Sequence, residues 1–359
     1  MKHFVFWVLL LVTLSCNNKD KEIRIDLDKD FDSSVEIVLS DIVSNLEYIP
    51  LETDTNCLLE ENTGILLFDN EIVAVNKRKI LLFDRKNGKF KREILHRGKD
   101  PEGYNSTMLG KGLMGNEKEE YVFLREWNGD ISTYSLKSGE RKSFPYGNYG
   151  AVAYADNGTF FATLLNMDGK NKVKMWVYKD YQLVDSIPNK QLFELKSNAI
   201  AFFDNEDIFY RYNGETYYKY NMNDTVFCVS VKGLAPAYTF NSTNKLPSIE
   251  MREHPELIGE QMKELYVVSG IMESKDYIMY NISYDDEKYK MVYDKKTGRG
   301  GCLEDGFSND IDNGISLWPN HITEKGEFVF LVNPASLEEA ELKALGLKED
   351  DNPMLVVGK

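Results

Sequence analysis

The chain has little of the chemistry on which metal-dependent and thiol-dependent enzymes rely. It contains four cysteines and four histidines in 359 residues, with no CxxC pair and no HExxH segment. Zinc sites and thiol redox sites use such closely spaced Cys and His residues, so the sequence supports neither. No GxSxG segment is present, and a Ser-His-Asp triad would have to use His96, His254 or His321.

Basic residues and long apolar runs are also scarce. The chain has 58 Asp and Glu against 43 Lys and Arg, which gives a net charge of −15 and a pI near 4.9. Nucleic-acid binding needs concentrated Lys and Arg, so we expect no nucleic-acid partner. No apolar run of about 18 residues follows the N-terminus, and we therefore expect no spanning helix in the mature chain.

The first sixteen residues read as a targeting segment. Lys2 and His3 precede an apolar stretch, Phe4 to Leu14, and Ser15 is followed by Cys16. This order resembles a bacterial lipoprotein signal, which would leave Cys16 as an acylated N-terminus that anchors the chain to a membrane. The resemblance implies a cell-envelope location in the outer membrane, either periplasmic or surface-exposed. The alternative is an ordinary secretory signal with an incidental cysteine.

A strand-turn-strand phrase recurs five times after this segment. Its aligned aromatic residues, from Phe83 to Tyr293, are spaced by 51, 44, 42 and 73 residues, which is typical of four-stranded propeller blades. The five copies are LLFDRKNGKF (81–90), STYSLKSGER (132–141), MWVYKDYQLV (175–184), YYKYNMNDTVF (217–227) and MVYDKKTGRG (291–300).

Five internal copies leave a sixth blade to be assembled from the two ends of the chain, because closure of the ring removes exposed sheet edges. Candidate strands are 35–39 and 46–51 at the front, with 328–332 and 354–357 at the back. We therefore predict an all-β fold, a six-bladed β-propeller of four-stranded antiparallel blades with two short helical insertions, which begin near Pro255 and Ser336. Residues 17–34 would be a charged tether, and 35–359 a single domain.

Cys57, Cys228 and Cys302 remain beyond the signal. Since an odd number cannot pair internally, at least one thiol must be free. Cys228 lies in a predicted alternating strand, VFCVS, and is interpreted as a buried small apolar residue.

Several phrases together resemble a family of six-bladed β-propeller lipoproteins of uncharacterised function from anaerobic gut bacteria, whose fold is similar to NHL-type propellers. The resemblance runs from about Leu39 to the C-terminus and implies the fold and export, with no known activity. The phrases are LSDI (39–42), LEYIPLET (46–53), the FDRKNGK and YDKKTGR turns, RGKDPEGY (97–104), NDTV (223–226) and NDIDNG (309–314) before Trp318-Pro319.

The longest connections between blades are predicted to carry the ligand site, since binding residues concentrate on loops of rigid scaffolds. These connections emerge on the rim opposite the repeated short turns. Trp127 and Trp318 are predicted to stack on a ligand, and nearby charged groups to fix it. Alternatively, Trp318 packs under a blade and the acidic residues cap turns. The predicted charged residues are Arg97, Asp100, Glu102, Arg125, Asp310 and Asp312.

These features predict a lipid-anchored, monomeric binding module for a carbohydrate, peptide or protein rather than an enzyme. The alternative is a metal-dependent lactonase or hydrolase that acts at the propeller channel, which rests on analogy of fold alone. No cofactor is expected apart from the divalent cation that this alternative would require. An EF-hand starting at Asp310 fails, because His321 stands at its twelfth position in place of Glu.

Overall fold

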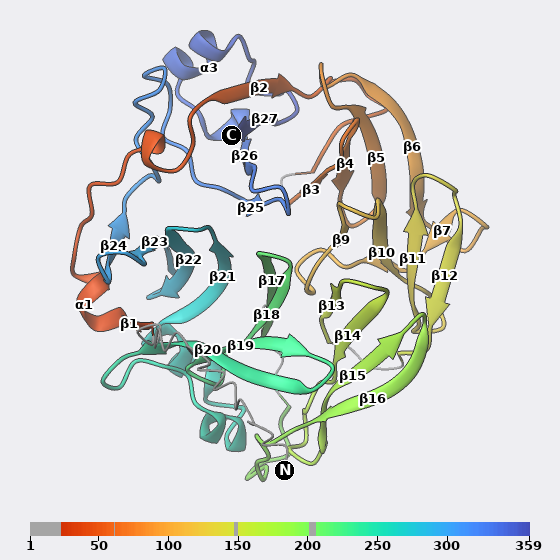
Figure 1. The fold of residues 1–359 in the computed structure, drawn as a ribbon, viewed down its shortest axis with the longest axis vertical. Coiled ribbons are helices and arrows are strands. Elements are labelled where there is room, and N and C mark those ends of the chain that lie inside the picture. Colours follow the sequence, from red (N-terminus) through yellow and green to blue (C-terminus); the bar gives the residue numbers. More distant parts are fainter. Residues whose placement is uncertain (1–22, 61, 147–149, 201–205) are drawn as a thin grey trace, which may run out of the picture.

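Six small antiparallel sheets surround a central axis, as Figure 1 shows. The computed structural model describes residues 23–60, 62–146, 150–200 and 206–359. Successive sheets follow one another around the ring, and in the first three and the fifth the chain runs from the central strand outward to the rim. The chain is therefore a six-bladed β-propeller, which confirms the predicted fold class.

The first three blades follow the chain in order. The first contains β3 (Gly64–Leu67), β4 (Glu71–Val75), β5 (Lys79–Asp84) and β6 (Phe90–Arg97), with β7 (Gly103–Tyr104) added in parallel to β6. The second has a split inner strand, β8 (Ser106–Thr107) and β9 (Gly115–Asn116), followed by β10 (Tyr121–Arg125), β11 (Ile131–Ser135) and β12 (Arg141–Phe144). The third contains β13 (Val152–Ala155), β14 (Thr159–Thr163), β15 (Val173–Lys179) and β16 (Gln182–Pro188).

The next two blades have the same plan. The fourth contains β17 (Asp207–Tyr212), β18 (Glu215–Tyr220), β19 (Thr225–Ser230) and β20 (Gly233–Asn241). The fifth contains β21 (Val267–Glu273), β22 (Tyr277–Tyr284), β23 (Glu287–Asp294) and β24 (Arg299–Leu303).

Burial along a strand depends on its place in the blade. In β4 and β5, residues 72–75 and 80–83 are buried without alternation, as expected for strands that are covered on both faces. The outer strand β6 instead exposes residues 91–93. An uninterrupted apolar run followed by a polar strand therefore marks the inner and outer parts of this blade.

The sixth blade joins the two ends of the chain. Its strands are β25 (His321–Ile322), β26 (Phe328–Val332) and β27 (Met354–Gly358), with β2 (Leu46–Pro50) as the outer strand. β2 pairs with β27 along its whole length, and Figure 1 shows the two side by side. The predicted closure through 46–51, 328–332 and 354–357 is confirmed.

The fourth segment predicted for this blade, residues 35–39, is not a strand. Val38 makes a single bridge to Ser308, and Leu39–Asp41 forms a 3-10 helix. β2 already occupies the outer position of the blade, so no place in the sheet remains for this segment.

The repeated phrase marks the third and fourth strands of four blades, but it is displaced in the fourth blade. There, residues 217–227 span β18 and β19, the second and third strands, and the matching turn is 231–232. Tyr and Phe recur along β17, β18 and β19, so the aromatic pattern fits more than one strand. The expectation that all five turns lie on one rim is therefore wrong for this copy.

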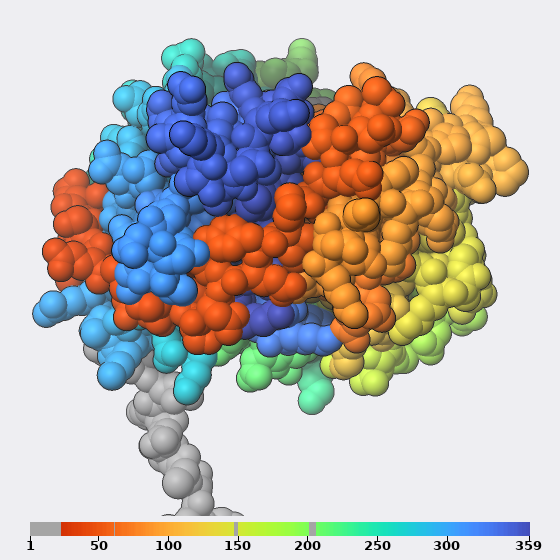
Figure 2. All heavy atoms as spheres, turned by 90° about the horizontal axis from the view of Figure 1, so that it is seen from above, coloured from red at the N-terminus to blue at the C-terminus, as the bar shows by residue number. Residues whose placement is uncertain are grey.

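The N-terminal segment is part of the fold from Arg24 onward. β1 (Arg24–Asp26) adds in parallel to the outer edge of β20, and α1 (Leu27–Phe31) follows it. Ile25 and Leu27 are fully buried, and Figure 2 shows the segment in red on the outer surface. The expected tether at 17–34 is thus wrong for these residues, because apolar side chains within this charged stretch pack against the blade edges.

Two helices lie where they were predicted. α2 (Ile258–Lys263) follows Pro255, and α3 (Glu339–Leu345) ends at Gly346, whose φ of 68° suits a left-handed cap. The N-cap of α3 is Glu338, whose backbone N–H donates a hydrogen bond to the Glu341 carboxylate. Ser336, which was predicted as the cap, instead ends a 3-10 turn (Pro334–Ser336). A further 3-10 helix is Ile249–Glu253. No helix of the described chain is long and apolar enough to cross a membrane.

The three cysteines in the described chain carry free thiols. Cys57 is fully buried, and its thiol lies 3.1 Å from the Glu52 carbonyl oxygen. Cys228 was predicted to be buried but is only half-buried, and its Sγ lies 3.8 Å from a carboxylate oxygen of Glu215 on the neighbouring strand.

Candidate functional site

The two faces of the ring carry different parts of each blade. The first-to-second and third-to-fourth turns emerge on one face, which we call the turn face. The second-to-third turns and the connections between blades emerge on the other, the connection face. At the centre of the turn face lie the six inner turns, residues 68–70, 117–120, 156–158, 213–214, 274–276 and 323–327.

A cavity of about 260 Å³ lies in the central channel. The first blade lines it with the apolar residues Ile65 and Leu66, whereas the other five blades supply polar groups. The polar lining residues are Glu117, Tyr154, Asp207, Tyr210, Arg211, Ser269, Glu273, Asn281, Asn320, His321 and Glu324.

Two wider depressions adjoin this cavity on the turn face. One has a volume of about 780 Å³ and shares Glu117 and Glu324 with the cavity. The other has a volume of about 600 Å³ and shares Arg211, Glu273 and Glu324 with it. Their sizes fall in the range of roughly 300–1,000 Å³ that is usual for small-ligand sites.

The hydrogen bonds of one carboxylate, that of Glu324, span the channel. Glu324, on the turn between β25 and β26, accepts hydrogen bonds on Oε1 from Tyr154 Oη at 2.8 Å and from Arg211 Nε at 2.7 Å. Tyr154 belongs to the third blade and Glu324 to the sixth, which is its opposite in a ring of six. The contact therefore bridges the channel from wall to wall.

Two further polar groups flank this bridge. His321 Nε2 lies 3.0 Å from Glu117 Oε1, and the same oxygen accepts the Leu67 N–H at 2.7 Å. These bonds connect the sixth, second and first blades around the channel.

A second chain of polar contacts lies between the fourth and fifth blades. Tyr210 donates to Glu273 at 2.7 Å, and Lys295 pairs with the other carboxylate oxygen at 2.5 Å. Burial raises the pKa of the Tyr210 hydroxyl well above its ordinary value, so this group stays protonated and acts as a donor.

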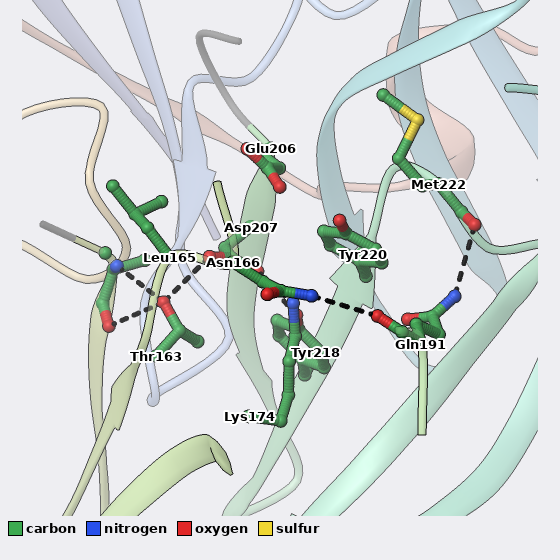
Figure 3. A network of polar contacts seen from close by, with 12 residues as sticks. Thr163, Leu165, Asn166, Lys174, Gln191, Glu206, Asp207, Tyr218, Tyr220 and Met222 are labelled. Carbon is green, nitrogen blue, oxygen red and sulfur yellow. Dashed lines mark hydrogen bonds and ion pairs between the residues drawn. The ribbon is translucent and has the colours of Figure 1, made fainter. Parts of the chain in front are cut away.

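A buried network of polar contacts joins the third and fourth blades, as Figure 3 shows. Asp207 accepts from Thr163 Oγ1 at 2.7 Å and from the Tyr218 hydroxyl at 2.5 Å, and its carboxylate lies 3.3 Å from Lys174 Nζ. The Lys174 ammonium also lies 3.5 Å from the centre of the Tyr220 ring. Because each of these contacts is within the protein, the network is built to hold two blades together.

The predicted rim residues fall into two groups on the connection face. The first group consists of Arg97, Asp100, Glu102 and Trp127, at the step from the first to the second blade. Trp127 is 46% exposed, but its Nε1 donates to the Gly98 carbonyl at 2.6 Å and Lys99 Nζ lies 5.1 Å from its ring centre. Part of this indole is therefore already engaged by its own loop.

The other predicted residues of the first group are also involved in contacts within the chain. Asp100 lies 2.9 Å from His96 Nε2 and accepts the Glu102 N–H at 3.1 Å. This contact with Asp100 raises the pKa of His96. Arg125 differs from its neighbours because it ends β10 and is buried.

The second group, on the connection from the fifth to the sixth blade, fastens the N-terminal segment. Asp310 accepts from Ser40 N at 2.9 Å and Ser40 Oγ at 2.5 Å, and Asp312 accepts from the Tyr48 hydroxyl at 2.9 Å. Trp318 stacks on Phe307 at 5.5 Å. These contacts favour the alternative in which Asp310, Asp312 and Trp318 stabilise the fold and do not bind a ligand. The sixth and first blades separate this second group from the first group.

The channel residues were missed because no local pattern marks them. Tyr154, Arg211 and Glu324 stand at the ends of inner strands from three blades, far apart in sequence. Each strand end looks like an ordinary turn, and only closure of the ring brings them together. In the described chain, no group of three or more His, Cys, Asp and Glu residues is placed to hold a metal ion.

The fold and this channel define a six-bladed propeller with a polar centre. By sequence, residues 22–359 match the family described as "Domain of unknown function (DUF4934)", and the chain belongs to that family. No curated protein matches the chain.

Two solved structures are similar to this chain to different degrees. A Bacteroides fragilis protein, provisionally described as exported, is similar with a TM-score of 0.69 at 15% identity, over 94% of this chain and 99% of that one. A Bacteroides thetaiotaomicron protein of unknown function gives a TM-score of 0.44 at 11% identity, over 94% of this chain and 75% of that one. At 15% identity, the similarity to the Bacteroides fragilis protein concerns the fold alone.

Proposed function

We propose that the chain is an exported envelope protein that binds a small polar ligand in the channel mouth on its turn face. The observation that supports this proposal is the convergence of charged and tyrosine side chains from five blades on the channel cavity, which two wider depressions adjoin. Pockets with a few fixed polar groups are the usual form of small-ligand sites. A short glycan or peptide suits this volume better than a folded protein partner, which would need a broad surface.

Attachment to a membrane is the second part of the proposal. The basic, apolar and Ser15-Cys16 order of the first sixteen residues supports lipid modification of Cys16, which lies outside the described residues. The similar Bacteroides fragilis protein, provisionally described as exported, is consistent with an envelope location. The outer membrane is the location we propose.

Binding rather than catalysis is the activity that we propose. The metal-dependent alternative would need several oxygen or nitrogen ligands converging in the channel, and the described chain offers no such group of three. The channel carboxylates are instead engaged by Arg, Tyr, Lys and His side chains.

Filling the channel should abolish binding. Ser269 of β21 lines the cavity, so Ser269→Trp would place an indole in it. On a panel of neutral and acidic oligosaccharides and short peptides, we expect Ser269→Trp to weaken the strongest interaction by at least about tenfold, close to 1.4 kcal/mol. Thermal melting of the variant controls for folding.

The matched comparison is Trp127→Ala on the connection face, which should change the same affinity by less than about twofold. If Trp127→Ala is the damaging substitution, the ligand binds at the rim and the channel assignment is wrong.

Cys16→Ala should release the protein from membranes. Without the thiol there is no site for the acyl chain, and no described helix would hold the protein in a bilayer. Fractionation of cells grown with a labelled fatty acid measures both effects. Equal labelling of wild type and Cys16→Ala would contradict lipid anchoring, and Cys57→Ala is the matched control because its thiol is buried in the fold.

A further inference from the structure

Glu324 stands where the three spaces of the channel meet. It lines the inner cavity and both depressions of the turn face. It is the residue that the cavity of about 260 Å³ shares with both depressions, of about 780 and 600 Å³.

The donors that bind Glu324 are held in place without it. The Arg211 side chain is 6% exposed, and its terminal nitrogens donate to Asp156 at 3.0 Å, to Thr216 Oγ1 at 2.9 Å and to the Tyr154 carbonyl at 3.2 Å. The guanidinium also lies 4.6 Å from the centre of the Tyr154 ring. Asp156 continues to compensate the charge of Arg211 when Glu324 is absent, so the pair of donors would remain ordered.

The carboxylate of Glu324, by contrast, is carried on a turn. Residues 323–326 form a tight turn closed by the bond from Gly326 N–H to Thr323 O at 2.9 Å, and Gly326 has a φ of 82°. The next residue, Lys325, pairs with Asp69 of the first blade on the exposed surface. A rotation of the Glu324 side chain alone would free Arg211 Nε and the Tyr154 hydroxyl without disturbing the sheet.

We propose that Arg211 and Tyr154 form a carboxylate-binding site, which Glu324 occupies in the unliganded protein and which a uronic-acid residue of a short acidic oligosaccharide takes over. The inference rests on the proposed binding function of the channel and names its ligand class. An arginine nitrogen and a hydroxyl that converge on one carboxylate oxygen form charge-assisted bonds in a poorly hydrated site.

A sugar fits the surroundings of this site better than a peptide. Tyr212 and Tyr277 line the adjoining depression, and a tyrosine combines an apolar ring that can pack on a sugar with a hydroxyl that can bond its polar groups. The inner strand of each described blade is an end strand of its sheet and has one free edge toward the channel, so the tripeptide in the test below examines peptide binding by strand addition.

The test uses a trimer of galacturonic acid, the neutral galactose trimer and a glutamate-containing tripeptide, titrated calorimetrically against the purified full-length chain. Glu324→Gln removes the internal competitor and keeps its size. We expect it to bind the acidic trimer about tenfold more tightly than wild type, because no state with an occupied site remains to be displaced. Affinity for the neutral trimer should change by less than about twofold. Tyr154→Phe should weaken only the acidic trimer, by a few-fold.

Glu126→Gln is the matched control. Glu126 is 17% exposed and lies 3.5 Å from Arg141 on the connection face, much as Glu324 is 18% exposed beside Arg211. This variant should leave all three affinities unchanged.

Each other outcome contradicts the inference. If Glu324→Gln gains no affinity for the acidic trimer, or gains equally for the neutral one, Glu324 is a structural bridge and not a stand-in for a ligand. Preference for the tripeptide would overturn the ligand class. Binding of the neutral trimer that Ser269→Trp abolishes and Glu324→Gln does not alter would preserve the proposed function while the acidic site fails.

Discussion

Deletion of residues 353–359 is expected to unfold the propeller. β27 lies inside the sixth blade, between β26 and β2, so its removal takes away both partners' hydrogen bonds. Leu355, Val356 and Val357 are fully buried, and the deletion would also open the core between the sixth and first blades. We expect the truncated chain to aggregate and to show no cooperative melting transition, as measured by circular dichroism and light scattering.

A point substitution in the same strand keeps this prediction measurable. Leu355→Ala should lower the free energy of unfolding by roughly 2–5 kcal/mol, because it leaves a cavity at a fully buried position. Leu183→Ala on the outer strand β16, where the side chain is 50% exposed, is the matched control and should cost less than about 1 kcal/mol. A truncated chain that melts like wild type would show that β27 does not close the ring.

The fold could be predicted because local patterns specify it. The third and fourth strands of most blades are joined by a short polar turn after an aromatic strand, and the closing strands at 46–50 and 354–358 are apolar. The prediction was wrong where the pattern was ambiguous. Both β17 and β18 are rich in aromatic residues and fit the repeat, and 217–227 was placed one strand too late in its blade. The packing of Arg24–Phe31 against the propeller was not predicted, because charged residues surround its two fully buried apolar side chains, Ile25 and Leu27.

The channel could not be predicted in the same way. Its groups come from strand ends whose distance is set by the ring, and Glu324 lies 113 residues from Arg211 and 170 from Tyr154. The length of the connections between blades led instead to the prediction that Asp310 and Asp312 bind the ligand. In the structure, their carboxylates accept hydrogen bonds from Ser40 and Tyr48. Acidic residues in loops serve turns and segment anchoring as readily as ligands, and sequence alone does not distinguish the two.

Neutralising either member of the buried pair between the third and fourth blades should strongly destabilise the protein. The Lys174 and Asp207 side chains are 8% and 5% exposed. Lys174→Met would leave the Asp207 carboxylate buried with the hydroxyls of Thr163 and Tyr218 as its partners in the described chain, and Asp207→Asn would leave a buried ammonium over Tyr220. Each single substitution should therefore lower the free energy of unfolding by roughly 3–5 kcal/mol in denaturant titrations, since an uncompensated charge remains buried between the two blades.

The double substitution of Lys174 and Asp207 should cost less than the sum of the two single ones. With both charges removed, the methionine keeps the volume of the lysine stem and the asparagine keeps an oxygen for Thr163, so most of the desolvation penalty disappears. The cycle should give a coupling of roughly 1–3 kcal/mol between the two sites. Lys142→Met, on the exposed pair with Glu140, is the control and should cost less than about 1 kcal/mol. Additive effects at Lys174 and Asp207 would mean that the two charges act independently, and that the ion pair does not join the blades.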